Sequence, residues 1–373
     1  SFCGAGCRID MRTNGGALLR VVSHEEMGIN EGNLCMKGRF CHDYLNDKER
    51  LTTAYVRRDG KLQPVSLEEA LEAAAKGLKD AQGDGFAVFV AGRATNEQAK
   101  ILAEMAAAKG SENVLSFGVD PVAAALFRLH ADKLVTGYEE LKQADFILAL
   151  DTDIHANSAV PLTLIRRLVR EGKPFMSVHT LTPEALSALE KAASPVVLLG
   201  RYPKAETARA AVDAAEKTGA KIFVETRKAN ERGVAQYLNV CRSAEGLKEA
   251  EALLVFGEDP AGAGLALPKA SFTVVFDLYM TETAKQADVV LPMSAPAEEE
   301  GTFTNVFGLV QTLSRAIEGR PSTALLRTLA DRLGTREPAP GRCAGIPDAQ
   351  AAPFAADVLE ERFEKRLEDT KVS

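Results

Sequence analysis

Strand-like and helix-like stretches alternate along most of the chain, and this alternation constrains the fold more than any other feature. Apolar runs that are typical of buried parallel strands occupy residues 86–92, 145–151, 174–179, 195–200, 221–226, 252–260, 272–279 and 287–292. Amphipathic stretches between them, such as residues 96–110 and 207–219, have the length and pattern of helices. Such alternation builds right-handed βαβ units with helices on both faces of parallel sheets. The sequence therefore predicts an α/β protein with doubly wound parallel sheets.

Charge and hydropathy exclude two classes of function. The formal net charge of −7 offers no basic surface for nucleic acid. No apolar run in the sequence approaches the roughly 18 residues that a membrane-spanning helix needs. We therefore expect a globular protein that has no nucleic-acid partner and no direct membrane span.

The cysteines are concentrated at the start of the chain. Of the 6 cysteines, four lie within the first 41 residues: Cys3, Cys7, Cys35 and Cys41. Cys241 and Cys343 stand alone and are expected to be unpaired thiols. A secreted disulfide scaffold would be small and uniformly rich in cysteine. This skewed distribution instead predicts a local metal or redox site in a reducing compartment.

Thiolates at this spacing suit an iron–sulfur cluster or zinc. Structural zinc sites use pairs of ligands separated by about two to four residues, and only Cys3 and Cys7 meet that condition. An iron–sulfur site accepts a long excursion such as the one before Cys35, and Gly4 and Gly6 would let backbone N–H groups approach the sulfides. From the residues alone, an iron–sulfur site, a zinc site and unligated thiols all stay open.

The cysteine-rich stretch resembles the iron–sulfur module of the molybdopterin oxidoreductase family. That module carries C-x2-C-x3-C, a long excursion and then C-x-K-G-R, and it binds one [4Fe–4S] cluster. Cys3 and Cys7 match its second and third cysteines, and Cys35, within CMKGRF, matches the fourth. The resemblance continues in GRATNEQA (92–99), in FGEDPAGAG (256–264) and, most strongly, in TETAKQADVVLPMSAPAEEEGTFTNVFGLVQ (281–311).

The resemblance implies a set of site residues. Cys3, Cys7 and Cys35 would bind the cluster, Lys37 would lie beside it, and Arg39 would help to fix its loop. The family pattern places the remaining cysteine directly ahead of Ser1, so we expect this chain to be a fragment of a longer protein. In the fragment the cluster is expected to be degraded or absent, with Cys41 as a candidate substitute ligand.

The resemblance also implies a domain organisation. Residues 1–60 would form the iron–sulfur module. Two intertwined α/β domains would follow it: residues 61–130 with 245–335 as the first, and residues 131–244 as an inserted Rossmann-like domain. Residues 336–373 are expected to form a linker rich in Pro and Ala and a charged terminal helix.

The sequence departs from the family where molybdenum enzymes bind their cofactor. Residues 112–127, which stand in place of the metal-ligand loop, contain no cysteine, and Ser116 is the one candidate there. Val178, His179 and Thr180 replace the family's D-P-R. The family's C-terminal β-rich domain is also expected to be missing. We therefore expect no molybdopterin.

One branch of the family shows this set of losses, the large iron–sulfur subunit (G type) of NADH–quinone oxidoreductase. The resemblance implies an electron-transfer and structural arm with one [4Fe–4S] site, no catalytic residue of its own, and other subunits of the peripheral arm as partners. It implies a cytoplasmic location, peripheral to the inner membrane through those partners. No G-x-G-x-x-G follows a strand, so NADH would bind another subunit.

Two other functions stay open. The chain could be a truncated molybdopterin-dependent oxidoreductase of the formate dehydrogenase type, or a scaffold without redox function that has lost its cluster. For two further features the sequence predicts only an exposed position. Glu298, Glu299 and Glu300 are expected to form a solvated turn, and His42 is expected at the surface.

Overall fold

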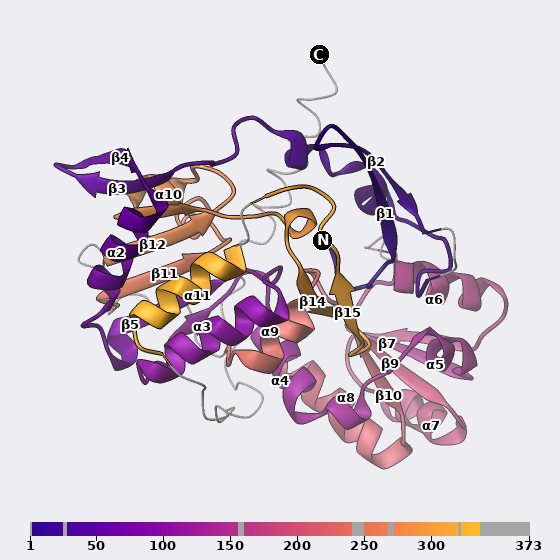
Figure 1. Ribbon diagram of the computed structural model, residues 1–373. Helices are drawn as coiled ribbons and strands as arrows, with labels where there is room; N and C mark the ends of the chain where they lie inside the picture. Colours follow the sequence, from indigo (N-terminus) through magenta and orange to yellow (C-terminus); the bar gives the residue numbers. More distant parts are fainter. Residues whose placement is uncertain are drawn as a thin grey trace.

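The computed structural model describes residues 2–24, 28–155, 160–240, 250–267, 272–319 and 322–335. Within these residues the strands form a seven-stranded sheet, a four-stranded sheet and two hairpins (Figure 1). The α/β class with parallel sheets is confirmed. Cys241, Cys343 and the segment 336–373 lie outside the described residues.

The larger sheet is mainly parallel. Its strands, in spatial order, are β4 (Lys61–Val65), β3 (Ala54–Arg58), β13 (Val289–Pro292), β12 (Phe272–Asp277), β11 (Ala252–Phe256), β5 (Phe86–Val90) and β6 (Val114–Leu115). Only β3 and β4 run antiparallel to their neighbours in this sheet. Every residue of β5 and β11 is buried, because other elements cover both faces.

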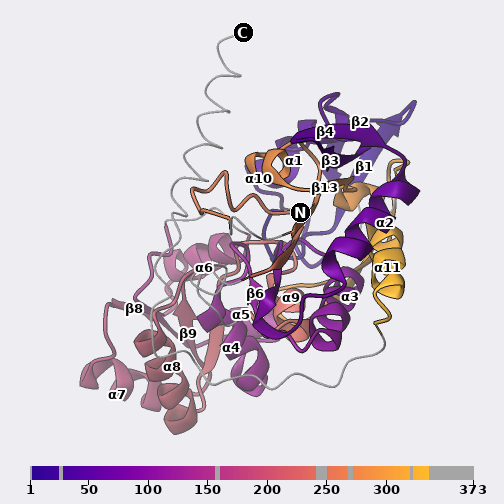
Figure 2. The same cartoon turned by 90° about the vertical axis from the view of Figure 1, so that its left-hand side faces the viewer.

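Helices from distant parts of the chain cover the larger sheet. One face carries α2 (Leu67–Leu78), α3 (Asn96–Ala108) and α11 (Ser322–Arg332), which lie side by side in Figure 2. The opposite face carries α10 (Glu282–Gln286) and loop residues. Ser66 caps α2, since its hydroxyl accepts a hydrogen bond from the Glu69 N–H at 3.2 Å.

The smaller sheet is wholly parallel. Its order is β10 (Lys221–Val224), β9 (Pro195–Leu199), β7 (Phe146–Leu150) and β8 (Phe175–Val178). One face packs against α5 (Tyr138–Gln143) and α6 (Val160–Arg170), and the other against α7 (Pro183–Lys191) and α8 (Ala205–Thr218). Helices α4 (Pro121–Leu129) and α9 (Glu231–Tyr237) contact each other and extend one apolar core from this sheet to the larger one.

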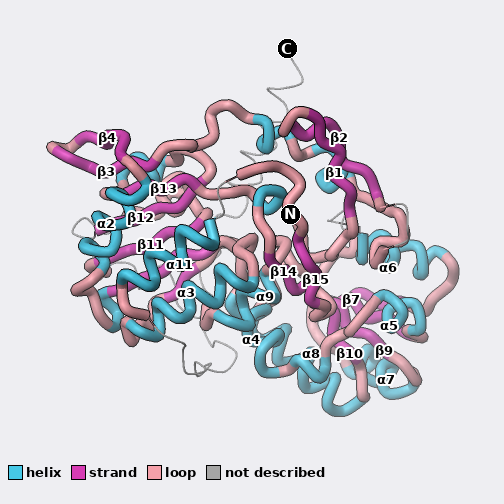
Figure 3. The backbone as a smooth tube through the Cα atoms, viewed as in Figure 1, coloured by secondary structure: helices cyan, strands magenta, loops and turns pink. Residues whose placement is uncertain are grey.

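The first residues form a small unit beside both sheets. It contains the hairpin of β1 (Ile9–Asn14) and β2 (Ala17–Ser23), the short helix α1 (Met36–Phe40) and a 3-10 turn over Asp43–Asn46. Its apolar side packs on residues that follow β13. A second hairpin, β14 (Gly301–Thr304) with β15 (Val310–Leu313), lies between the two sheets (Figure 3).

The domain boundaries proposed from the sequence stay predictions. β3 lies in the predicted module 1–60, although it pairs with β13 in the larger sheet. Among the described helices, none has the length and apolar character to cross a membrane.

Candidate functional site

Three of the predicted ligands lie near one another. Cys3 and Cys7 precede β1, and Cys35 immediately precedes α1. Burial, with a further contribution from the neighbouring thiols of Cys3 and Cys35, raises the pKa of the Cys7 thiol to about 12. Burial also raises the pKa of Cys3, and Cys35 adds to that rise. The fold therefore brings the three thiols within electrostatic range of one another, and all three residues are half-buried.

The three thiols could bind either a single metal ion or an iron–sulfur cluster. The described residues contain no group of three His, Cys, Asp or Glu side chains arranged around a single ion. A four-iron cluster binds each thiolate through a different iron, so its ligands stand further apart than those of one zinc ion. The metal would also supply the positive charge that deprotonates buried thiols. Thiolates are ligands that both an iron–sulfur cluster and zinc accept.

Cys35 is held by the helix that it begins. Its Sγ accepts a hydrogen bond from the Gly38 N–H at 3.3 Å and so caps α1. This N–H···S bond fixes the position of the sulfur at the first turn of the helix. Lys37 and Arg39 lie on the same short helix, and their roles beside a cluster stay predictions.

Cys41 lies at the other end of α1. Burial raises the pKa of its thiol, the charge of Lys37 opposes that rise, and Cys35 adds to it. Its backbone N–H donates to the Lys37 carbonyl oxygen. Cys41 therefore neighbours Cys35, and its role as a substitute ligand stays a prediction.

Gly4 and Gly6 belong to the segment that carries Cys3 and Cys7 (residues 3–7, the cysteine loop). Atoms from other parts of the fold lie very close to both glycines. The Gly4 N–H donates to Thr226 Oγ1 at 3.1 Å, and a Cβ on Gly4 would lie 2.2 Å from that oxygen. Gly6 has a positive φ of +73°, and a Cβ there would lie 2.3 Å from Gln311 Oε1. The Gly4 N–H is thus engaged by Thr226, so glycine at this position is explained by close packing rather than by access to a sulfide.

The hairpin β14–β15 supports the cysteine loop. The Val306 N–H donates to the Gly4 carbonyl oxygen at 2.7 Å, and Gln311 Nε2 donates to the Gly6 carbonyl oxygen at 2.8 Å. Arg232 of α9, which is buried, donates from Nη1 to the Val306 carbonyl oxygen at 2.7 Å. These bonds fix the backbone that carries Cys3 and Cys7.

Two of the sequence motifs bind each other. Asn96, the first residue of α3, donates from Nδ2 to Thr302 Oγ1 at 3.0 Å and to Thr304 Oγ1 at 3.1 Å. The carboxylate of Glu97 accepts bonds from the Thr302 N–H and from its hydroxyl. Asn230 Nδ2 donates to Asn96 Oδ1 at 3.0 Å. The T-N-E turn and the G-T-F-T-N strand therefore form one polar network, which anchors the hairpin to the larger sheet.

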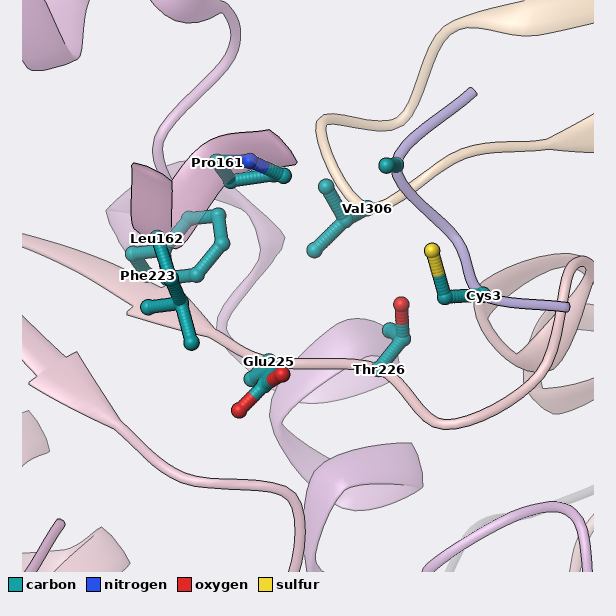
Figure 4. A pocket seen from close by; sticks show the side chains of 8 residues that line it. Cys3, Pro161, Leu162, Phe223, Glu225, Thr226 and Val306 are labelled. Atoms are coloured by element: carbon teal, nitrogen blue, oxygen red, sulfur yellow. The ribbon is translucent and has the colours of Figure 1, made fainter. Parts of the chain in front are cut away.

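A small cavity of about 10 Å³ adjoins Cys3 (Figure 4). Its lining residues are Cys3, Ala5, Pro161, Leu162, Phe223, Glu225, Thr226 and Val306. A cavity of this size has room for about one water molecule. It is a packing space beside the thiol and not a substrate pocket.

Charged side chains meet where strands of both sheets end. Arg93 follows β5, Lys228 follows β10 and Glu258 follows β11. The nearby charge of Arg93, together with burial, lowers the pKa of Lys228 to about 7, and burial raises the pKa of Glu258. The surroundings are crowded, because a Cβ on Gly92 would lie 2.4 Å from the Gly118 carbonyl oxygen and 2.9 Å from Lys228 Cβ.

The residues noted for molybdenum enzymes have other partners. Ser116 Oγ is buried and accepts a hydrogen bond from the Gly118 N–H at 3.0 Å. The His179 ring is exposed and lies 3.5 Å from Asp151.

The expectation for His42 is wrong, and the expectation for the acidic triplet holds only for Glu300, which is exposed. Glu298 and Glu299 are buried: the carboxylate of Glu298 pairs with Arg50, and that of Glu299 accepts bonds from Ser322 and Thr323. His42 is buried as well, with Nε2 3.0 Å from the Gly38 carbonyl oxygen and the Phe2 ring edge-on at 5.2 Å. Arg50 satisfies the charge of Glu298 from a distant part of the chain, and the Gly38 carbonyl oxygen contacts His42 Nε2, whereas His42 Nδ1 has no partner among the described residues.

The residues that support the cysteine loop were missed by sequence reasoning. Thr226, Val306 and Arg232 carry no sequence signal for this role, since they contact the loop only through the tertiary fold.

Comparisons with known proteins identify families and relatives that this chain resembles. The model described as "Molybdopterin oxidoreductase Fe4S4 domain" matches residues 1–47, and the model described as "Molybdopterin oxidoreductase" matches residues 50–194 and 186–330. NADH-quinone oxidoreductase subunit 3 of Thermus thermophilus is 28% identical over 91% of this chain and 51% of its own length. The chain thus spans about half the length of that curated relative.

Two further similarities widen the comparison. The alpha subunit of F420-dependent formate dehydrogenase 2 of Methanococcus maripaludis is 23% identical over 90% of this chain and 70% of its own length. Acetylene hydratase from Pelobacter acetylenicus superposes with a TM-score of 0.54 at 13% identity, covering 89% of this chain and 68% of that one. The last similarity shows the fold alone.

Proposed function

Because this chain belongs to the molybdopterin oxidoreductase family, we propose that it is part of the large iron–sulfur subunit of an NADH–quinone oxidoreductase. In this role it is an electron-transfer and structural arm with one [4Fe–4S] site, and it has no catalytic residue of its own. The observation that carries the proposal is that the half-buried cysteines Cys3, Cys7 and Cys35 lie within electrostatic range of one another. Similarity to subunit 3 of the Thermus enzyme supports the choice of branch.

The chain's own residues would bind and shield the cluster. When bound, a [4Fe–4S] cluster accepts and donates one electron at a time. Cys3, Cys7 and Cys35 would supply thiolates, and the family pattern places a fourth cysteine ahead of Ser1. The hydrogen bond from the Gly38 N–H to Cys35 Sγ would help to orient that ligand. Lys37 and Arg39 would stabilise the reduced, more negative form by their charge.

Crowding at the strand ends supports the absence of a molybdenum cofactor. The side chain of Lys228 lies close to Gly92 and Gly118, and its charge is within range of the buried Glu258. Ser116 is engaged by backbone. In this proposal the chain holds no molybdopterin, in keeping with the departures of its sequence from the family pattern.

The partners and the location follow from the same proposal. The chain would be held by other subunits of the peripheral arm, and NADH and quinone would react elsewhere in that assembly. It would be cytoplasmic and peripheral to the inner membrane through those subunits.

Metal analysis of the full-length protein tests the proposal. We expect anaerobically purified protein to contain about four irons and matching sulfide for this site, beyond those of any other cluster, and no molybdenum. Cys35→Ser should remove those irons. Stoichiometric molybdenum would contradict the proposal and favour a formate dehydrogenase type, which the similarity to the Methanococcus protein makes the second candidate. Protein without iron at this site would favour a scaffold.

A further inference from the structure

Tyr138 has a buried hydroxyl group that lacks a hydrogen-bond partner within the described residues. The residue begins α5, and only 8% of its surface is exposed. Leaving a buried hydroxyl without a partner costs about 1–3 kcal/mol. The Tyr138 hydroxyl therefore needs a hydrogen-bond acceptor, and no described protein atom provides one.

The ring of Tyr138 is fixed beside the cysteine loop. It packs against Phe307, with ring centroids 4.6 Å apart. Both rings belong to an apolar cluster that includes Val306. The Val306 N–H in turn binds the Gly4 carbonyl oxygen. The tyrosine therefore touches the loop's support rather than a free surface.

The surroundings of the hydroxyl point to the cysteines. Burial raises the pKa of Tyr138, and Cys7 and then Cys3 contribute most among the charged neighbours. Glu31 is also within range, but its carboxylate pairs with Lys142. A hydroxyl in these surroundings stays protonated and is available as a donor.

We propose that the Tyr138 hydroxyl donates a hydrogen bond to a sulfur atom of the iron–sulfur site formed by Cys3 and Cys7, and so raises its reduction potential. The inference rests on the proposed function, because it needs the cluster as the acceptor. A hydrogen bond to sulfur stabilises the reduced form more, since that form carries more negative charge. Tyr138 lies on α5, which packs on the four-stranded sheet, whereas Cys3 and Cys7 precede β1. The reduction potential would therefore depend on how these two parts of the fold pack against each other.

Tyr138→Phe in the full-length, anaerobically purified protein tests this hydrogen bond. The variant keeps the ring against Phe307 and removes only the hydroxyl. At a fixed potential, the ratio of reduced to oxidised cluster should fall about tenfold, which corresponds to a midpoint about 59 mV lower for a one-electron couple. A redox titration followed by electron paramagnetic resonance measures this ratio. Tyr55→Phe, in β3 of the larger sheet, is the matched control and should leave the potential unchanged.

A second variant keeps the test valid if Tyr138→Phe fails to hold a cluster. Replacing Tyr138 by 3-fluorotyrosine makes the phenol a stronger donor without changing the packing, and the potential should rise above that of the wild type. In deuterated solvent, the wild type should show an exchangeable deuteron coupled to the reduced cluster, and Tyr138→Phe should lack it.

The results distinguish a failure of the proposed function from a failure of the Tyr138 hydrogen bond alone. A wild-type protein without iron at this site overturns the proposed function and this inference with it. A wild-type protein with the cluster, but with equal potentials and equal deuteron couplings in all variants, overturns only the role of Tyr138.

Discussion

The Gly4 N–H donates a hydrogen bond to Thr226 Oγ1 at 3.1 Å, across a sequence separation of 222 residues. This bond ties the segment between two candidate ligands to the residue that follows β10 by two positions. The cysteine loop therefore has its shape only when the four-stranded sheet has formed.

Gly4→Ala should disturb this junction. The added methyl group would lie 2.2 Å from Thr226 Oγ1, so either the side chain or the loop must shift. Overpacking of this kind costs about 1–3 kcal/mol, and we expect a lower unfolding free energy in urea together with less bound iron. Gly85→Ala is the control, since its Cβ would lie 3.4 Å from Glu251 Oε2, an ordinary contact. Equal unfolding free energies for the two variants would contradict the role of the Gly4 contact.

The two cysteines that flank α1 should differ in importance. Cys35→Ser should abolish iron binding at this site, because Cys35 neighbours both Cys3 and Cys7. Cys41→Ser should leave the iron content of the full-length protein unchanged. Iron and sulfide assays on anaerobic preparations distinguish the two. If Cys41→Ser also lost iron, the cluster would use Cys41 as a ligand.

Asn96→Ala should destabilise the hairpin that supports the cysteine loop. The change removes bonds to Thr302, Thr304 and Asn230 inside a buried network. Lost hydrogen bonds and unpaired partners should lower the unfolding free energy by about 3 kcal/mol. Gln286→Ala is the control, since its exposed amide makes a local bond to the Glu282 carbonyl oxygen, and its effect should stay within about 0.5 kcal/mol. Comparable losses in both variants would show that the network adds no stability.

Asp277 should make stability depend on pH. Burial raises the pKa of this carboxyl, at the end of β12, from 3.8 to about 7. Its folded pKa lies above its unfolded pKa, so the stability that it contributes is complete below pH 3.8 and is lost as the pH rises through about 7. Asp277→Asn stays neutral, so its unfolding free energy should rise relative to that of the wild type across this range, by up to about 1.4 kcal/mol per pH unit.

Urea denaturation at a series of pH values checks this expectation. The difference in unfolding free energy between Asp277→Asn and the wild type should level off above the folded pKa. A difference that stays constant from pH 4 to pH 8 would show that the carboxyl titrates normally in the folded protein.

Strand positions followed from the sequence because buried parallel strands are apolar throughout. The runs at 86–92 and 252–260 became β5 and β11, in which every residue is buried. The hairpin β14–β15 carries no such run, and its partners, Asn96 and Asn230, lie far away in sequence. Burial of Glu298 escaped prediction for the same reason, since Arg50 satisfies its charge across the fold.

The sequence by itself determined the α/β class, the family, and the cysteines that are candidate ligands, because apolar periodicity and ligand spacing are local patterns. Only the tertiary structure decided what surrounds those ligands. The bonds from Thr226, Val306 and Gln311 to the cysteine loop, and the unpartnered hydroxyl of Tyr138, join segments that no local pattern relates. Their placement depends on how the two sheets and the hairpin pack, which is a property of the whole chain.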